Sequence, residues 1–378
     1  MNIRKLTRAE QRVSVGYIQQ LGIKSYGQGN TYPQEIENIV RSSSTGSACV
    51  DRYARFIEGD GFNELLADVV VSNDGSTAND VLSSIANDLA MYGGFAIHVN
   101  YDIFCKITDI QHVPFEWCRL EEGDDTGYIG GIAVHQDWTG TKTKNGKRMK
   151  VTQQSVQHYH VFNPYPPIVS AQISKAGGIE SYTGQILYVG ANGRMAYPTP
   201  KADRVITEMS TDEGLANIKF RNVRCNFLTA QMLITKQDQT LEDDYGMSAD
   251  GFASAIEKFQ GDEKANNILQ MTISNEDEKP EIIEFPVKNF DKDFNVTDQS
   301  VVERIYCAYE QEPFLAIRNG RLGFSGTIVR DAYNYYASLV TKEQKTISRA
   351  FTAIFDRWAQ VLPSADTFIN PIKFVAEE

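Results

Sequence analysis

The sequence predicts an α+β fold in which a sheet-rich part precedes a mainly helical part. Between residues 40 and 200, short segments of alternating or β-branched residues follow segments with apolar residues at helical spacing. After the phrase YPTP at residues 197–200, helical spacing dominates the remaining chain. The chain has 378 residues, of which 42% are hydrophobic, so it can bury a sizeable core and we expect one or two folded domains.

The sheet-rich part is expected to contain two helices and a series of strands. The helices are predicted at residues 47–57 and 80–91, and the second ends at the helix-terminating pair Gly93-Gly94. Because the strands follow one another between turn signals, we expect a meandering antiparallel sheet. The strands are predicted at residues 95–100, 105–110, 115–120, 128–136, 156–162 and 185–189.

The mainly helical part is expected to hold two helices around a compact insert, then a loop and a longer helix. Ser210, with Glu213 three residues later, forms a capping-box signature and predicts a helix that begins there and runs toward Met232. A second helix is predicted at residues 294–310, because it must end before Pro313. The other predicted elements are strands at 231–236, 268–274 and 281–287, a helix at 249–259, a loop at 317–327, an amphipathic helix at 328–360 and a closing strand in FINPIKFV.

Composition and charge exclude several classes of protein. The net charge is −12 with a pI near 5.0, which argues against a surface that grips nucleic acid throughout. The N-terminus lacks an apolar signal-peptide core, and no apolar run approaches the roughly 20 residues that cross a bilayer, so we expect no membrane partner. The cysteines are odd in number and form no CxxC pair, which is typical of reduced thiols in a cytoplasm: Cys49, Cys105, Cys118, Cys225 and Cys307.

The insert carries most of the net negative charge of the chain. Residues 235–287 contain 13 Asp or Glu and 4 Lys, a net charge of −9. Such a surface repels DNA and attracts basic partner surfaces.

No motif predicts catalysis. The nearest candidate for a phosphate-binding loop is GTKTKNGKRMK at residues 140–150, but five residues separate Gly140 from Gly146, and Arg148 stands where a hydroxyl residue would hold magnesium. A solvated basic hairpin is the better interpretation. GxSxG, HExxH and CxxC motifs are absent from the sequence. We therefore expect no catalytic residue and no cofactor.

Metal binding is not expected either. His158 and His160 share one face of a predicted strand and could begin a metal site, but no neighbouring Cys or carboxylate in the sequence completes it. The acidic clusters at residues 121–125, 242–244 and 276–278 lie in polar turns without a basic or histidine neighbour. We interpret them as solvated loops rather than as magnesium sites of a nuclease.

The loop at residues 317–327 combines flexibility with positive charge. It contains an Asn-Gly pair, two further glycines, and the arginines Arg318 and Arg321, and no acidic residue lies between Pro313 and Arg330. A loop of this kind can touch a phosphate backbone without reading sequence. The alternative is that both arginines pair with carboxylates of a neighbouring subunit.

The order of these parts resembles the portal protein family of tailed bacteriophages, over most of the chain. The resemblance rests on the helix and strand in DVLSSIANDLAMYGGFAIHVN at residues 80–100 and on the strand segment HYHVF at 158–162. It rests above all on the order from Ser210 to Trp358, which is helix, insert, helix ending in the phrase EPFL, glycine-rich loop and amphipathic helix.

The resemblance implies a portal-like fold with an antiparallel-sheet wing, two stem helices flanking a small α/β clip, a tunnel loop and a long C-terminal wing helix. Few residues follow Trp358, so the crown of larger members would be short or absent. The implied boundaries are a wing at 1–208, stem helices at 209–232 and 289–312, a clip at 233–288, a tunnel loop at 313–327, and the wing helix with the closing strand at 328–378.

The resemblance also implies which residues meet partners. Those that would face the channel belong to the tunnel loop: Arg318, Asn319, Gly320, Arg321, Gly323, Phe324 and Gly326. Those that would dock partners belong to the clip: Glu242, Asp243, Asp244, Glu276, Asp277 and Glu278.

The function implied is a ring, typically of twelve subunits, that forms the DNA channel at one capsid vertex and serves genome packaging, retention and ejection. Its partners would be further copies of the chain, double-stranded DNA bound without sequence preference, the terminase motor, the major capsid and scaffolding proteins, and head-tail connector proteins. It would reside in the virion and, during assembly, in the host cytoplasm. The alternatives are another oligomeric head-tail adaptor or virion structural protein, and a metal-dependent nuclease.

Overall fold

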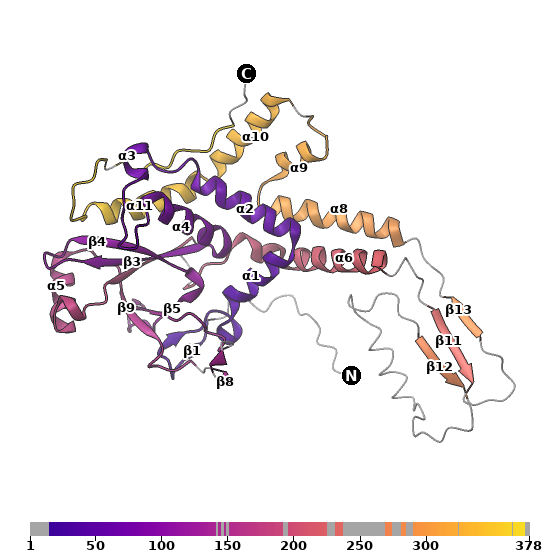
Figure 1. Cartoon of the computed structure of the whole chain (residues 1–378), viewed down its shortest axis with the longest axis horizontal. Helices are drawn as coiled ribbons and strands as arrows, with labels where there is room; N and C mark the ends of the chain where they lie inside the picture. Colours follow the sequence, from indigo (N-terminus) through magenta and orange to yellow (C-terminus); the bar gives the residue numbers. More distant parts are fainter. Residues whose placement is uncertain are drawn as a thin grey trace. The chain divides into compact units, whose positions relative to one another are not determined.

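The chain divides into two compact units in its computed structural model (Figure 1). The first unit comprises Met1–Arg41, Gly46–Ile206 and Tyr306–Glu378, and the second comprises Ser42–Thr45 and Thr207–Ile305. The structure describes residues 15–140, 143–144, 147–148, 151–191, 196–224, 231–236, 269–273, 281–284, 290–323, 325–364 and 366–374.

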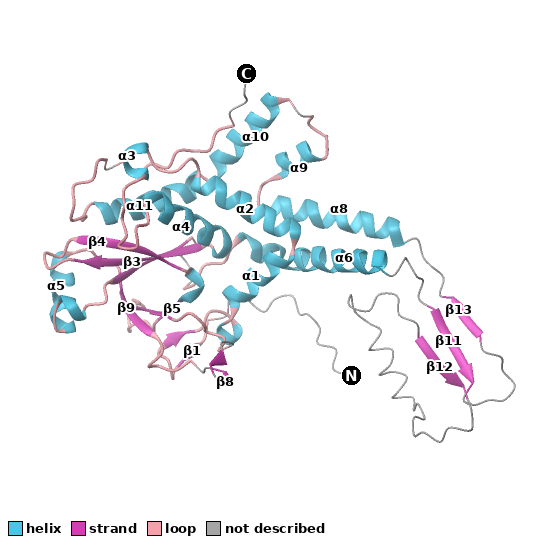
Figure 2. Cartoon of the chain, in the orientation of Figure 1, coloured by secondary structure: helices cyan, strands magenta, loops and turns pink. Residues whose placement is uncertain are grey.

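A six-stranded sheet forms the centre of the first unit (Figure 2). Each predicted strand overlaps one of its strands. All neighbouring strands are antiparallel except β9 and β10, which run parallel with Gln185 opposite His160. The predicted antiparallel meander is therefore wrong. In sheet order the strands are β4 (Ile107–Val113), β3 (Gly94–Tyr101), β10 (Gln185–Gly190), β9 (Gln157–Val161), β6 (Gly131–Val134) and β5 (Cys118–Leu120).

Helix α5 (Pro166–Ala176) explains the parallel pair. It connects β9 to β10, and a crossover of this kind returns the chain to the same end of the sheet, so both strands run in one direction. This helix is absent from the sequence prediction. Its signals are Pro166 and Pro167 in the first turn and Gly177, with a φ of 90°, directly after the last residue.

Helices α2 (Ser44–Glu58) and α4 (Ala78–Tyr92) confirm the two helices predicted before the sheet. Thr77 and Asp80 cap the start of α4 reciprocally, and Gly93, with a φ of 76°, ends it. Helix α4 packs on β3 and β4 through its buried apolar face. The smaller elements are α1 (Tyr32–Ser42), α3 (Glu64–Ala67), the hairpin of β1 (Tyr17–Ile18) and β2 (Ile23–Lys24), and the expected hairpin of β7 (Thr143–Lys144) and β8 (Lys147–Arg148).

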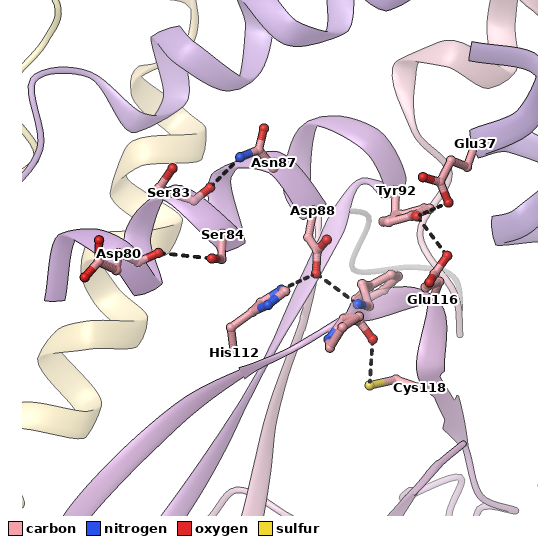
Figure 3. A network of polar contacts seen from close by, with 12 residues as sticks. Glu37, Asp80, Ser83, Ser84, Asn87, Asp88, Tyr92, His112, Glu116 and Cys118 are labelled. Atoms are coloured by element: carbon pink, nitrogen blue, oxygen red, sulfur yellow. Dashed lines mark hydrogen bonds and ion pairs between the residues drawn. The ribbon is translucent and has the colours of Figure 1, made fainter. Parts of the chain in front are cut away.

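A partly buried histidine–carboxylate pair joins α4 to β4 (Figure 3). The carboxylate of Asp88 accepts hydrogen bonds from Nε2 of His112, at 2.7 Å, and from the backbone N–H of Phe115, at 2.9 Å. Burial raises the pKa of Asp88, while the interactions with His112 and Phe115 oppose that rise. The pair therefore fixes α4 on the sheet.

Two carboxylates share one hydroxyl at the end of α4. The Tyr92 hydroxyl lies 3.1 Å from Glu37 on α1 and 3.2 Å from Glu116 (Figure 3). Burial raises the pKa of Glu116, and the neighbouring Glu37 carboxylate raises it further. A single hydroxyl proton can bond only one of the two carboxylates fully. The carboxylates of Glu37 and Glu116 therefore repel each other when both are ionised.

A fully buried arginine anchors the segment before α1. Arg119 on β5 donates to the side chain and backbone oxygens of Asn30 and to the backbone oxygens of Glu116 and Cys118. Its guanidinium also lies 5.5 Å from the centre of the Tyr26 ring. Asn30 adopts a φ of 64°, a conformation in which Asn is enriched, and its side-chain and backbone oxygens both accept hydrogen bonds from Arg119.

The C-terminal part of the first unit contains α9 (Glu312–Arg318), α10 (Gly326–Leu339) and α11 (Thr341–Phe355). The single long helix predicted at residues 328–360 is wrong, because Val340, with a ψ of 2°, separates α10 from α11. No Gly or Pro marks this break in the sequence. The apolar face of the predicted amphipathic helix is buried on α11, as expected, at Ile347, Phe351, Ile354 and Phe355.

The prediction of a closing strand is also wrong, because the described residues 366–374 contain no strand. The segment is held by single backbone bonds instead. Asn370 accepts from the N–H of Asp60 and donates to the oxygen of Gly61, both at 2.8 Å. The C-terminal segment thus docks on the turn after α2.

The second unit contains the two helices and the strands of the insert. Strand β11 (Gln231–Lys236) lies between β12 (Leu269–Ile273), which is parallel to it, and β13 (Glu281–Glu284), which is antiparallel. These confirm the three predicted strands. The predicted insert helix at residues 249–259 lies outside the described residues.

Helices α6 (Ile206–Arg224) and α8 (Phe290–Ala308) run side by side within this unit. Ion pairs join Lys219 to Asp298, at 2.7 Å, and Arg304 to Glu208, at 3.3 Å. The start predicted at Ser210 is wrong, since a 3₁₀ turn at Lys201–Val205 leads directly into α6 and places Ser210 inside the helix. The helix, expected to run toward Met232, is described as far as Arg224, and Met232 belongs to β11, in agreement with the strand predicted at residues 231–236.

Candidate nucleic-acid interface between α9 and α10

The candidate site is an exposed turn between two helices of the first unit. The loop expected at residues 313–327 is shorter than predicted, because α9 occupies Glu312–Arg318 and α10 begins at Gly326. Pro313 stands in the first turn of α9, where its missing N–H costs no hydrogen bond. The described residues of the turn are 319–323 and 325.

The first glycine of the turn ends α9. The N–H of Arg321 donates to the oxygen of Ala316 at 2.8 Å, and the N–H of Gly320 donates to Ile317 at 3.0 Å. These two bonds, with a φ of 70° at Gly320, make a Schellman motif. Gly323 also has a positive φ, of 74°, and Ser325 then caps α10 by accepting from the N–H of Ile328.

The turn presents positive charge to solvent. Arg318 and Arg321 are both exposed, as are Asn319, Gly320 and Gly323. Arg318 is in the last turn of α9, where a cation interacts favourably with the helix dipole, and its Nη1 lies 3.5 Å from the hydroxyl of Tyr306. An exposed cationic turn of this kind can meet a phosphate backbone.

The other predicted channel residues have different outcomes. Gly326 is the first residue of α10 rather than part of the turn. Phe324 lies outside the described residues. The predicted docking residues of the insert also lie outside them: Glu242, Asp243, Asp244, Glu276, Asp277 and Glu278.

Aromatic side chains support the base of the turn. The ring of Phe314 on α9 lies 5.9 Å from Phe56 on α2, and 5.7 and 5.5 Å from Tyr333 and Tyr336 on α10, measured between ring centres. The guanidinium of Arg52 stacks over Phe314 at 4.9 Å. The turn therefore projects from a packed base, and none of these residues is among the candidates predicted from the sequence.

The histidine pair has a partner that no local sequence pattern indicates. Nδ1 of His158 lies 2.6 Å from the carboxylate of Glu121, so the interpretation of that acidic cluster as lacking a histidine partner is wrong. Both residues line a groove of about 340 Å³ together with His160 and Lys175. Among the described residues, no three His, Cys, Asp or Glu side chains are placed to hold a metal ion.

Two further expectations concern disulfide bonds and membrane-spanning helices. The described cysteines, Cys49, Cys105, Cys118 and Cys307, form no disulfide, and Cys225 lies outside the described residues. No helix in the described part of the chain is long and apolar enough to cross a membrane.

Comparisons with known proteins found similarity only among solved structures, since no family model and no curated protein matches the chain. A chain in the neck of an empty gene transfer agent particle is 10% identical, with 87% of this chain and 83% of that chain covered and a TM-score of 0.46. A chain in the neck of a native particle is 12% identical, with 81% of each chain covered and a TM-score of 0.39. An HK97-family phage portal protein from Corynebacterium diphtheriae is 11% identical, with 76% and 83% covered and a TM-score of 0.33.

Proposed function

We propose that this chain is a portal protein that assembles into the ring-shaped DNA channel of a tailed-phage particle. The observation that carries the proposal is the order of its parts. A sheet-centred unit leads into α6, a small sheet of β11, β12 and β13, the returning helix α8, and then the exposed turn with Arg318 and Arg321. This order supports a wing, a stem, a clip and a tunnel loop.

The charge distribution supports a conduit rather than a DNA-binding protein. Double-stranded DNA carries about one negative charge per 1.7 Å of its axis, so a surface rich in Lys and Arg would hold it firmly. A chain of net charge −12 with two arginines on one exposed turn would instead let DNA pass with brief, sequence-blind contacts.

The acidic insert gives the ring a docking surface. Its net charge of −9 at residues 235–287 would repel DNA and attract a basic surface of the terminase motor and later of the head-tail connector. The ring, typically of twelve copies, would contact capsid and scaffolding proteins at one vertex of the virion, after assembly in the host cytoplasm. In this role the protein needs no catalytic residue or cofactor.

The experiment that tests this function replaces both Arg318 and Arg321 with alanine. Each contact with sliding DNA is weak, so we expect rings to form normally while the fraction of packaged DNA that is retained changes. Nuclease protection of packaged DNA in particles carrying the variant measures retention. The matched control replaces Arg349 and Arg357 of the first unit with alanine, which should leave retention unaltered.

The result also separates the two roles of the arginines. If the double variant fails to form rings, Arg318 and Arg321 contact a neighbouring subunit and their proposed channel role is wrong. If rings form and DNA retention equals that of the control, the turn does not meet DNA.

A further inference from the structure

A sharp turn joins α8 to α9 and buries a glutamine. Glu310 adopts a φ of 58°, which is uncommon for a residue other than glycine, and the N–H of Gln311 bonds back to the oxygen of Tyr306 at 2.9 Å. Gln311 is fully buried at the start of α9. The chain therefore buries an amide side chain at the start of the helix that leads to the exposed turn.

All the hydrogen-bonding groups used by this amide come from α2 and α10. Nε2 of Gln311 donates to the backbone oxygen of Cys49 and to the hydroxyl of Tyr336, each at 2.9 Å. Its Oε1 accepts from Nη1 of Arg52 at 2.8 Å. The Tyr336 hydroxyl in turn donates to the backbone oxygen of Tyr309 at 3.1 Å. One side chain thus joins both helices that flank the turn to α2.

Arg52 extends this connection into the aromatic base. Its guanidinium bonds Gln311 and lies over the rings of Phe314, at 4.9 Å, and Tyr306, at 5.7 Å. Tyr306 is also the residue whose hydroxyl contacts Arg318. The chain of contacts from Gln311 therefore ends at one of the two exposed arginines.

We infer that Gln311 is a positioning residue that fixes residues 319–323 of the turn relative to α2. The turn is short, so holding α9 through Gln311 and Phe314 and α10 through Tyr336 restricts where Arg318 and Arg321 lie. A buried amide that loses its partners leaves polar groups unsatisfied in the protein interior, which favours local opening. The importance of this position for DNA rests on the proposed function, whereas the restraint itself does not.

Trypsin cleavage tests the restraint, because Arg318 and Arg321 are themselves trypsin sites. In the full-length protein we expect Gln311→Met, which keeps the volume and removes all three hydrogen bonds, to increase the cleavage rate at these arginines about tenfold. Gln311→Glu keeps the acceptor for Arg52 but loses both donated bonds, and should give an intermediate rate. Variants are compared in the same oligomeric fraction.

Gln344 supplies a matched control. It is also buried, and its Nε2 donates to the backbone oxygen of Phe56 on α2 at 3.1 Å, but it lies on α11. Gln344→Met should lower the melting temperature without raising cleavage at Arg318 and Arg321. Equal cleavage of the two Met variants would overturn the positioning role of Gln311.

A second measurement separates this inference from the proposed function. DNA retention is compared in particles that carry Gln311→Met and particles that carry Gln344→Met. Faster cleavage together with altered retention supports both statements. Faster cleavage with retention equal to the control upholds the restraint and contradicts the DNA-facing role of the turn.

Discussion

Some ionisable side chains of the first unit are partly buried, which disfavours their charged form. Glu116 is the clearest case, because it shares the Tyr92 hydroxyl with Glu37. Burial and the Glu37 carboxylate raise its pKa above the ordinary value of about 4.3. A raised folded-state pKa contributes stability that is fully present below the unfolded-state pKa and is lost as pH rises through the folded-state pKa.

The variant Glu116→Gln should therefore stabilise the protein at neutral pH. It removes the charged form that burial and Glu37 disfavour, so its melting temperature should exceed that of the unaltered protein at pH 7. The difference should shrink toward pH 4, where Glu116 becomes protonated. Thermal unfolding at both pH values measures this, and a gain of the same size at pH 4 and pH 7 would rule out the electrostatic explanation.

An exposed glutamate provides the comparison. Glu180 lies at the surface of the first unit, so Glu180→Gln should change the melting temperature little and by the same amount at both pH values. If the change in melting temperature depends on pH more strongly for Glu180→Gln than for Glu116→Gln, the stabilisation comes from the lower net charge instead.

Several contacts at this scale could not be predicted from the sequence. Glu121 and His158 are 37 residues apart, and Gln311 and Cys49 are 262 apart, so no helical or strand periodicity relates the members of either pair. Only the tertiary fold decides which of these polar side chains meet. The exposed arginines of the turn were easier to identify, since glycines and an absence of carboxylates mark the segment itself.

At the scale of elements, periodicity located the strands well and helix boundaries less well. Each predicted strand of the insert overlaps a strand of the structure, because β-branched and apolar residues stand between polar segments. The break at Val340 carries no Gly or Pro, and the start of α6 follows from the preceding 3₁₀ turn rather than from the capping signature at Ser210. Tertiary context overrides local signals at such boundaries.

The insert is the element whose removal tests partner docking. Deleting residues 235–287 and joining the two helices by a short flexible linker should abolish binding of the terminase motor while rings still form. Binding of purified motor to immobilised rings measures this. A ring that lacks the insert and still binds the motor would show that docking occurs elsewhere.

Charge neutralisation distinguishes electrostatics from shape at the same element. Replacing Glu242, Asp243 and Asp244 with the corresponding amides removes three of the 13 acidic residues without shortening the chain. We expect weaker motor binding at low salt and a smaller loss of binding as salt is raised. Unaltered salt dependence would mean that these carboxylates do not face the partner.

At the scale of the whole molecule, the α+β class and the two helices around a small three-stranded sheet could be predicted, but the topology of the six-stranded sheet could not. The parallel pair of β9 and β10 depends on α5, whose proline and glycine signals indicate a helix without indicating the strand order. The order of strands in a sheet depends on how each connection passes over the sheet. The spacing of apolar residues along the sequence does not indicate that order.

Assembly into a closed ring is the central claim for the whole molecule. A channel for DNA requires head-to-tail contacts whose rotation closes, since contacts that do not close produce filaments. All other parts of the proposed function, including the DNA-facing turn and the docking insert, depend on this geometry.

Electron microscopy of the purified full-length protein, combined with native mass measurement, tests this claim most directly. We predict closed rings with a central opening and a particle mass that is a whole-number multiple of 42.4 kDa, with about twelve copies expected from the family resemblance. A single species of 42.4 kDa across a broad concentration range, or open filaments without rings, would contradict the account.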